Sequence, residues 1–379
     1  MADPVRLFVL AGEPSGDRIG ADLVKRMRIH RTVQLTGIGG DALAGEGLRS
    51  FFPMSDLSVM GLVDVLARLP LLYWRLRQTV QAIMDAPPDV VVLIDSQVFS
   101  QSVAERLRKA GYKGPIVLYV SPSVWAWKPE RAPALAPLYD EILAVLPFEP
   151  AVMKRLGGPP TVYVGHPALE HTSLRAAQPE RGPLLLLPGS RTGELRRHLP
   201  LMEAIAMILQ RHPRVSGFVL PTPRSAEQQV VEAVGNWTVP VFVTATSEGK
   251  ATAFRESVAA AAVTGTVTLE LALAGVPMVT TYVAEQAQWQ RAKKYNIRFA
   301  ALPNILYGSE IVPEILGRRR EPERVVEEVT RLLDDADATG QQVAGFARIR
   351  AGMETGLPGA PLTDAAARVL AHLRADTGT

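Results

Sequence analysis

Short apolar runs alternate along this chain with longer amphipathic or polar segments. In the first half, these runs are rich in Val, Ile and Leu and are bounded by Gly, Pro or Asp. Such runs predict parallel strands that are buried on both faces of a sheet. The strands expected in the first half are 6–11, 33–39, 88–95, 115–120, 141–146 and 161–165.

The second half repeats this alternation after a polar stretch, 166–182, that is rich in helix and strand breakers and predicts a hinge. The strands expected there are 184–187, 217–220, 239–243, 259–263 and 277–282, and the clearest helices of the whole chain are expected at 17–27, 199–210, 322–334 and 361–374. Two successive strand–helix series predict an α/β fold with two Rossmann-like domains.

Composition narrows the functional classes. The 379 residues, 47% of them hydrophobic, are enough for two cores, and the net charge of +3 without a basic aromatic face argues against nucleic acid. The chain has no Cys, and its six His form no close pair, so we expect neither a disulfide nor a metal site. No apolar run approaches the roughly 18 residues of a transmembrane helix, and no signal peptide is recognisable, so we expect a cytoplasmic protein.

Polar and aromatic side chains follow the strand 115–120. Ser121, Ser123 and Trp125 alternate with small or apolar residues just after this strand. In an open α/β sheet, ligands bind at the carboxyl ends of the strands, so these residues are candidates for substrate binding. The alternative is a surface turn whose tryptophans pack into the core.

A polar, glycine-containing turn follows the first strand. Its candidate binding residues are Gly12, Glu13, Ser15, Gly16 and Asp17. The spacing does not match the dinucleotide fingerprint GxGxxG, so no NAD site is expected. Such a turn still lets a ligand approach the backbone and the N–H groups of the following helix. The alternative is a tight turn in which glycine is needed for its backbone angles.

Asp95 ends the most apolar strand of the chain. The preceding residues, 90–94, are all Val, Leu or Ile, and core packing does not explain an acid at this position. At the carboxyl end of a parallel strand, the acid would face the ligand crevice, where it is the best candidate for a catalytic base.

Two strand-to-helix turns of the second half are suited to a diphosphate. Gly189, Ser190 and Arg191 follow one strand, and Thr264, Gly265 and Thr266 follow another. A helix start offers N–H donors, and Arg adds a forked cation, which together stabilise phosphate oxygens without a metal. The alternatives are a surface arginine in the first turn and simple helix capping in the second.

The stretch 55–74 is unusually apolar for a surface segment, and Pro70 is expected to interrupt any helix there. It either packs into the core or lies on lipid. If it lies on lipid, the expected membrane contacts are Val59, Met60, Leu62, Val63, Leu66, Leu69 and Leu72.

Several of these motifs together resemble those of one enzyme family. They are Gly12–Asp17, Val59–Gly61, Ser121–Trp127, Leu146–Glu149, Gly165–Pro167, Leu187–Arg191 and Leu302–Asn304. In this order, they are similar to the motifs of the lipid-A-disaccharide synthases, inverting glycosyltransferases of the GT-B fold at the inner membrane of Gram-negative bacteria. The resemblance spans residues 6 to 320.

The resemblance implies a domain arrangement and a reaction. The two domains would face each other across a cleft, with an acceptor and membrane-facing domain at 1–165, a UDP-sugar domain at 166–345, and a helix at 346–379 that crosses back to the first domain. The enzyme would use no cofactor, and its partners would be UDP-2,3-diacylglucosamine, the acceptor 2,3-diacylglucosamine 1-phosphate (lipid X) and inner-membrane lipids that it contacts peripherally.

Site residues follow by the same resemblance. Asp95 would be the catalytic base, Glu270 would hold the nucleotide ribose, and Asn304 and His166 would contact substrate. The chain departs from the family pattern at Gln97, Val98 and Ser100, just after Asp95. This departure leaves open a UDP-sugar enzyme of the same fold with another acceptor, an epimerase, or a non-catalytic nucleotide-sugar-binding protein.

Overall fold

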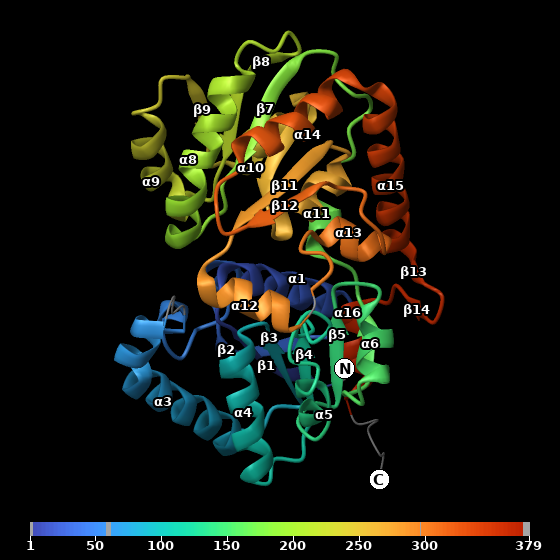
Figure 1. Ribbon diagram of the computed structural model, residues 1–379. Helices are drawn as coiled ribbons and strands as arrows, with labels where there is room; N and C mark the ends of the chain where they lie inside the picture. Colours follow the sequence, from blue (N-terminus) through green and yellow to red (C-terminus); the bar gives the residue numbers. More distant parts are fainter. Residues whose placement is uncertain (1–2, 58–61, 296, 374–379) are drawn as a thin grey trace. The chain divides into compact units, whose positions relative to one another are not determined.

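The structure, a computed structural model, describes residues 3–57, 62–295 and 297–373 (Figure 1). It divides the chain into two compact units. Unit 1 contains residues 1–167 and 355–379, and unit 2 contains residues 168–354. The chain therefore begins and ends in the same unit.

Unit 1 is built on a six-stranded parallel sheet of order β2-β1-β3-β4-β5-β6. Its strands are β1 Val5–Ala11, β2 Val33–Ile38, β3 Val90–Ile94, β4 Ile116–Tyr119, β5 Glu141–Ala144 and β6 Thr161–Tyr163. All six were predicted as strands, because buried parallel strands show up as unbroken apolar runs. In β3 all five residues are buried.

Helices cover both faces of this sheet. They are α1 Pro14–His30, α2 Asp41–Gly45, a 3-10 turn Met54–Asp56, α3 Leu62–Asp85, α4 Gln97–Lys109, α5 Arg131–Leu135, α6 Glu149–Arg155 and, from the end of the chain, α16 Ala365–Ala371. Side chains of α3 and α4 share one core with alternate strand residues such as Phe8 and Leu93. Helix α1 lies on the other face, where Gly16 and Gly20 pack against Ile94.

Helix α3 corrects the expectation that Pro70 interrupts any helix, because it runs through Pro70 without a break. Proline removes one backbone hydrogen bond, but contacts later in the helix compensate. Arg75 binds Asp56 at 2.7 Å and lies over the ring of Phe52, and Leu76 and Ile83 are buried.

The C-terminal segment is attached to unit 1. A short hairpin, β13 Gly356–Leu357 with β14 Ala360–Pro361, leads to α16. Arg368 and His372 both contact the buried carboxylate of Glu141 on β5, with His372 Nε2 at 3.2 Å. Burial alone would raise the pKa of Glu141, but its hydrogen bonds with His372 and Arg368 outweigh burial and lower this pKa. Helix 361–374 was expected; the observed helix is shorter and begins at Ala365, where the Asp364 side chain caps it by accepting the N–H of Ala367.

Unit 2 has a second six-stranded parallel sheet, of order β12-β11-β10-β7-β8-β9. Its strands are β7 Gly182–Leu187, β8 Val215–Pro221, β9 Val241–Thr244, β10 Ala259–Val263, β11 Met278–Val283 and β12 Glu314–Gly317. Strand β12 is not among the strands expected for the second half. Its Ile315 pairs with Thr281 of β11 and is buried.

The helices of unit 2 again lie on both faces of the sheet (Figure 1). They are α8 Thr192–Leu209, α9 Arg224–Val234, α10 Ser247–Glu256, α11 Thr266–Ala274, α12 Gln286–Lys294, α13 Leu302–Tyr307, α14 Pro322–Asp334 and α15 Ala336–Thr355, and α7 Pro167–His171 lies at the junction with unit 1. Helices α8 and α14 share one core with strand residues such as Leu186 and Ala261. Each fully buried Leu contributes about 1.5–3 kcal/mol.

Candidate active site

In unit 1 the strand order reverses between β1 and β3, and the two predicted motifs that follow these strands meet there. Leu10 is paired with Leu93 and Ala11 with Ile94, so Gly12 and Asp95 leave the same edge of the sheet. A Cβ built on Gly12 would fall 2.0 Å from Ser96 Oγ. A reversal of this kind is where open α/β sheets bind ligands.

Asp95 lies in a strained strand-to-helix turn. Its φ is +50° and that of Ser96 is +43°, so two consecutive residues with side chains adopt the left-handed conformation. Each such residue costs on the order of 1–3 kcal/mol. Ser100 stabilises the turn, because its hydroxyl group donates to Asp95 O at 2.8 Å and its N–H to Ser96 O at 2.9 Å.

The Asp95 carboxyl group is half-buried, and this burial raises its pKa above the usual range for aspartate. The backbone N–H of Ser96 opposes the shift, but its effect is smaller. A raised pKa makes the carboxylate a stronger proton acceptor than a solvated aspartate. Asp95 is therefore our candidate for a general base.

The loop with the candidate residues Ser121, Ser123 and Trp125 begins beside Asp95. Asp95 N donates to Tyr119 O at 2.9 Å, and Tyr119 is the last residue of β4. Ser121 is 4% exposed, and Ser123 and Trp125 are half-buried. The structure thus brings this loop and Asp95 together.

The turn after β1 separates into an open and a buried part. Glu13 and Ser15 are exposed at the start of α1, where ligand could reach them, and Gly16 packs against Ile94. Asp17 was expected to face ligand, but it is 4% exposed, and its carboxylate accepts the N–H groups of Gly40, Ala42 and Leu43 at 2.7, 2.8 and 3.2 Å. Its carboxylate is buried and caps the start of α2, so we leave Asp17 out of the proposed ligand contacts.

In unit 2 the strand order reverses between β7 and β10. Leu187 of β7 is paired with Ala262 of β10, so the turns 189–191 and 264–266 leave the same edge of the sheet side by side. Both turns were predicted to hold a diphosphate. Their adjacency supports one shared anion site rather than two unrelated helix starts.

Glu194 shapes the turn 189–191. Gly189 has φ +95°, which favours glycine, and a Cβ there would fall 2.6 Å from Glu194 Oε2. Ser190 N and Arg191 N donate to this carboxylate at 3.2 and 3.3 Å, and Arg191 Nη1 binds it at 3.1 Å. The Arg191 side chain is 69% exposed, so its guanidinium group remains accessible to an anion.

The turn 264–266 leaves the start of α11 open. Gly265 and Thr266 are exposed, and the N-cap residue of α11, Gly265, has no side chain that could cap the helix. Thr264 is half-buried beside them, with its N–H 3.3 Å from Thr281 O. Glu270, one turn further on, forms an ion pair with Lys250 of α10. The helix start is thus available to phosphate oxygens.

The structure places Asn304 in the interior of unit 2. It was expected to contact substrate, but it is fully buried and its amide is used within unit 2. Its Nδ2 donates to Val312 O and Glu314 Oε1, and its Oδ1 accepts the N–H groups of Ile311 and Val312, all within 2.9 Å. It holds together the ends of α13 and β12, so we do not assign it a ligand.

Three histidine and glutamate side chains have strongly shifted pKa values. Burial lowers the pKa of the candidate His166 to about 4, so it is neutral at pH 7. His198, which the sequence did not single out, has its pKa lowered to about 4 by burial as well. Glu149 is 2% exposed, and burial raises its pKa to about 8. The motif Leu146–Glu149 was the signal that could have drawn attention to Glu149.

The expected membrane segment is described in part. Val59 and Met60 lie outside the described residues; Leu62, Val63 and Leu66 belong to α3, but their side chains are not described. Further along α3, Leu72 is half-buried, whereas Leu69, Tyr73 and Trp74 are about half exposed. Arg75 lies over the Trp74 ring at 4.3 Å and Arg106 over the Tyr73 ring at 4.9 Å. Exposed aromatic rings with arginines suit a membrane–water interface.

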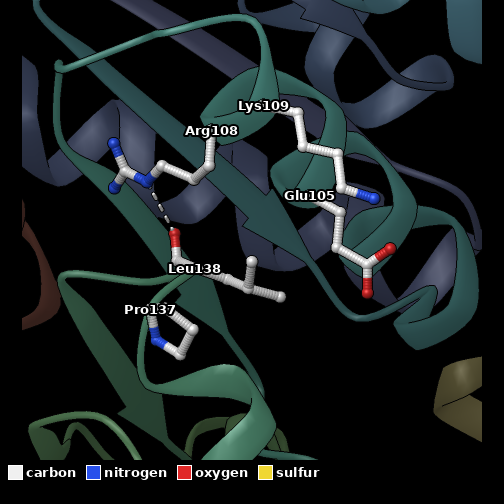
Figure 2. A pocket seen from close by; sticks show the side chains of 5 residues that line it. All are labelled: Glu105, Arg108, Lys109, Pro137 and Leu138. Carbon is white, nitrogen blue, oxygen red and sulfur yellow. Dashed lines mark hydrogen bonds between the residues drawn. The ribbon is translucent and has the colours of Figure 1, made fainter.

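A surface pocket elsewhere in unit 1 does not belong to this site. Figure 2 shows its lining residues, Glu105, Arg108, Lys109, Pro137 and Leu138. They come from the end of α4 and the segment before β5, and so lie at the amino edge of the sheet. Arg108 Nε donates to Leu138 O at 3.1 Å, so this arginine links the end of α4 to the segment before β5.

Across 3–57, 62–295 and 297–373, no three His, Asp or Glu side chains are placed to hold a metal ion. No helix in the described part of the chain is long and apolar enough to cross a bilayer.

Comparison with known proteins agrees with this geometry. The sequence profile of the family described as "Lipid-A-disaccharide synthetase" matches residues 7–356. A lipid-A-disaccharide synthase of Rhodopseudomonas palustris is 42% identical over 366 residues, which cover 93% of each chain.

Solved structures are similar in fold. S. aureus MnaA, in a co-structure with UDP, has a TM-score of 0.60 at 12% identity, covering 96% of this chain and 100% of that one. CalG4, the calicheamicin glycosyltransferase, has a TM-score of 0.58 at 19% identity, with complete coverage of both chains. The fold is therefore that of the GT-B glycosyltransferases and related UDP-sugar enzymes.

Proposed function

Because the chain belongs to the lipid-A-disaccharide synthase family and is thus a glycosyltransferase of lipid A biosynthesis, we propose a specific reaction for it. It transfers 2,3-diacylglucosamine from UDP-2,3-diacylglucosamine to the 6-hydroxyl group of 2,3-diacylglucosamine 1-phosphate. The products are the β-1,6-linked disaccharide 1-phosphate and UDP, and the anomeric carbon inverts.

The observation that carries this proposal is the position of Asp95, a half-buried carboxylate of raised pKa at the strand reversal of unit 1. We assign the acceptor to this unit. Asp95 removes the proton of the 6-hydroxyl group as its oxygen attacks the anomeric carbon, and the bond from that carbon to the UDP oxygen breaks. Glu13 and Ser15, exposed at the edge of the same site, are the polar groups we assign to orienting the acceptor.

We assign UDP to unit 2. The departing diphosphate gains negative charge, which the exposed Arg191 guanidinium group and the open N–H groups at the start of α11 stabilise. Thr264 and Thr266 add hydroxyl donors beside that helix start. Glu270 is our candidate for the ribose hydroxyl groups, with Lys250 holding its carboxylate in place. This set of donors supplies charge stabilisation without a divalent ion.

Both proposed substrates are acylated, so the enzyme must reach lipid. We propose that α3 supplies this contact, with Leu69, Tyr73 and Trp74 at the interface and the neighbouring arginines toward anionic head groups. The enzyme would then be a peripheral protein of the inner membrane. A flotation assay with anionic vesicles tests this contact: the wild type floats, and Trp74→Ala with Tyr73→Ala reduces the floating fraction.

The deciding experiment incubates the full chain with both substrates in detergent and EDTA and detects disaccharide 1-phosphate and UDP by mass spectrometry. Product from the wild type, and loss of product in Asp95→Asn, supports the reaction, the base and metal independence together. UDP binding without product argues for a different acceptor. Val98, 80% exposed on the first turn of α4 after Asp95, would then be the first position to examine.

A further inference from the structure

Glu149 is a buried acid that the proposed reaction does not use. It begins α6, just after β5, and is 2% exposed. Leu146 N donates to its Oε2 at 3.0 Å, and the indole Nε1–H of Trp125 donates to its Oε1 at 3.2 Å. Both oxygens therefore act as acceptors toward N–H groups. Burying a carboxyl group costs free energy, so this arrangement calls for an explanation beyond packing.

Trp125 is fixed by two consecutive residues. Its ring packs edge to face on Phe148, with centroids 5.3 Å apart and an interplanar angle of 82°. The neighbouring Glu149 then accepts the indole N–H. The ring contact sets where the indole lies, and the hydrogen bond sets which way its polar edge points. Together they define one orientation for Trp125.

The loop that contains Trp125 needs such an anchor. It is bounded by Val120 at φ +75° and Lys128 at φ +54°, two residues with side chains in the left-handed conformation. This conformation is especially unfavourable for a β-branched residue such as Val120. Strained backbone persists where surrounding contacts hold it. Trp125 belongs to this loop, and its contacts with Phe148 and Glu149 hold the strained backbone in place.

The same loop continues directly from the residue that binds Asp95. Tyr119 O accepts the N–H of Asp95, and the next residue, Val120, donates its N–H to Leu143 O of β5 at 2.9 Å. A shift of Trp125 therefore moves a loop attached beside the proposed base. Glu149 itself lies further away, at the start of α6, and lies outside the proposed reacting groups.

We propose that Glu149 is a positioning residue which, by holding the indole of Trp125, fixes loop 121–127 in the shape that the sugar acceptor requires. This inference rests on the proposed function for the identity of the acceptor. A carboxyl group is suited to the task because each of its oxygens accepts an N–H. A glutamine has one accepting oxygen, and its NH₂ group would face one of the two donors, so it cannot satisfy both.

The test compares Glu149→Gln, Trp125→Phe and the double variant in the full chain. Each single change should lower kcat/KM for the acceptor about tenfold, since small misplacements of a binding loop are costly. The KM for the donor and the Kd for UDP should stay unchanged. The double variant should match the single ones, because all three remove the same contact.

Glu141→Gln is the matched control. Glu141 is also 2% exposed, but it is the first residue of β5, the strand that precedes α6, and it is paired with Arg368 and His372. It should lower the melting temperature without changing the KM for the acceptor. If Glu149→Gln behaves like this control, or if the effects of Glu149→Gln and Trp125→Phe multiply in the double variant, the positioning role is wrong.

Hydrogen exchange separates this inference from the proposed function. Faster exchange in residues 120–128 of Glu149→Gln and Trp125→Phe, with unchanged exchange in β1 and β3, supports the anchor even if the wild type makes no disaccharide. Unchanged exchange in 120–128 overturns it even if the wild type is active. If Glu149→Gln does not fold, Trp125→Phe provides both measurements.

Discussion

Gly12 and Ser96 are in direct contact, with room for no side chain between them. A Cβ on residue 12 would fall 2.0 Å from Ser96 Oγ and 3.0 Å from Ser96 Cβ. The turn after β1 and the turn that carries Asp95 are therefore fitted to each other. Any change at residue 12 that adds atoms must displace the neighbour of the proposed base.

Gly12→Ala is expected to reduce kcat at least about tenfold and to cost about 1–3 kcal/mol of stability through overpacking. Gly12→Ala with Ser96→Ala should recover part of the stability, because the closest atom, Ser96 Oγ, is removed. Gly45→Ala is the control, since a Cβ at Gly45 meets nothing within 4 Å. Steady-state kinetics and urea unfolding measure the two effects. A fully active Gly12→Ala would contradict the fit between the two turns.

Asp95→Asn is expected to lower kcat by about 10²–10⁴-fold while UDP binds as before. In the wild type, the raised pKa of Asp95 should move the acid limb of kcat/KM to a higher pH than a solvated aspartate would give, with activity gained as the carboxyl group ionises. Asp89→Asn is the control. Asp89 lies just before β3, at the opposite end of the same strand, and binds Arg6 at 2.6 Å. Equal losses of kcat in both variants would argue against a base at Asp95.

Arg191→Ala is expected to weaken UDP binding about ten- to hundredfold, the range for losing a charge-assisted hydrogen bond. Arg191→Lys should recover part of the affinity, because the charge remains but the forked geometry is lost. Isothermal titration with UDP measures both. Arg255→Ala is the control, as Arg255 is exposed near the end of α10, at the amino edge of the same sheet. Unchanged affinity in Arg191→Ala would remove this turn from the nucleotide site.

How far the sequence predicted this site depends on the kind of residue. Asp95 could be placed because a run of buried apolar residues shows where β3 ends, and parallel strands end at one edge. The positions of Asp17 and Asn304 could not be predicted, because their side chains bind backbone N–H groups of residues 40–43 and 311–312, which are distant in sequence or in other elements. Sequence shows that an acid or an amide is present, but not which backbone groups the fold delivers to it.

The same limit applies to whole elements. The first half of helix α15, residues 336–355, was not predicted, because its buried positions there are Gln342 and Gly345 rather than apolar residues. Helix α14 was predicted because its stripe of Val325, Val329, Leu332 and Leu333 is clear. Glu149 was not singled out as a candidate, because its contact with Trp125, 24 residues earlier in the chain, forms only in the folded protein.

Asn304→Ala is expected to destabilise unit 2 rather than to weaken substrate binding. It leaves the N–H groups of Ile311 and Val312 unpaired, at about 1–3 kcal/mol for each buried group that finds no other partner. Asn304→Asp keeps both acceptors but places a second carboxyl group beside Glu314, so it should also destabilise. Urea unfolding and UDP titration at low temperature distinguish the outcomes. A loss of UDP affinity at full stability would restore Asn304 to the ligand site.

Stability should fall in mild acid because of His198. Val283 N donates to its Nε2 at 2.9 Å, so this nitrogen is an acceptor, and Nδ1 then donates to Glu194 O at 2.8 Å. Its folded pKa, about 4, lies below the ordinary 6.5, so the folded chain favours the neutral ring. Neutral His198 contributes fully to the free energy of unfolding above about pH 6.5. This contribution is lost as the pH falls toward 4, and the loss amounts to about 3 kcal/mol at most.

Urea unfolding between pH 4 and 8 measures how steeply the free energy of unfolding changes with pH. His166, with a pKa of about 4 for the same reason, contributes in the same direction. His198→Gln and His166→Gln should each flatten the slope in part, and the double variant should flatten it further. A wild-type stability that is constant between pH 6.5 and 4.5 would contradict the neutral state of both rings.

The attachment of α16 to β5 has a consequence for synthesis on the ribosome. Arg368 and His372 reach Glu141 across more than two hundred intervening residues, and all of unit 2 is translated between these partners. Unit 2 is continuous in sequence and can fold while the chain is still growing. Unit 1 is completed last, when α16 has left the exit tunnel. A chain cut short at residue 354 would therefore contain all of unit 2 but a first unit whose Glu141 carboxylate lacks Arg368 and His372.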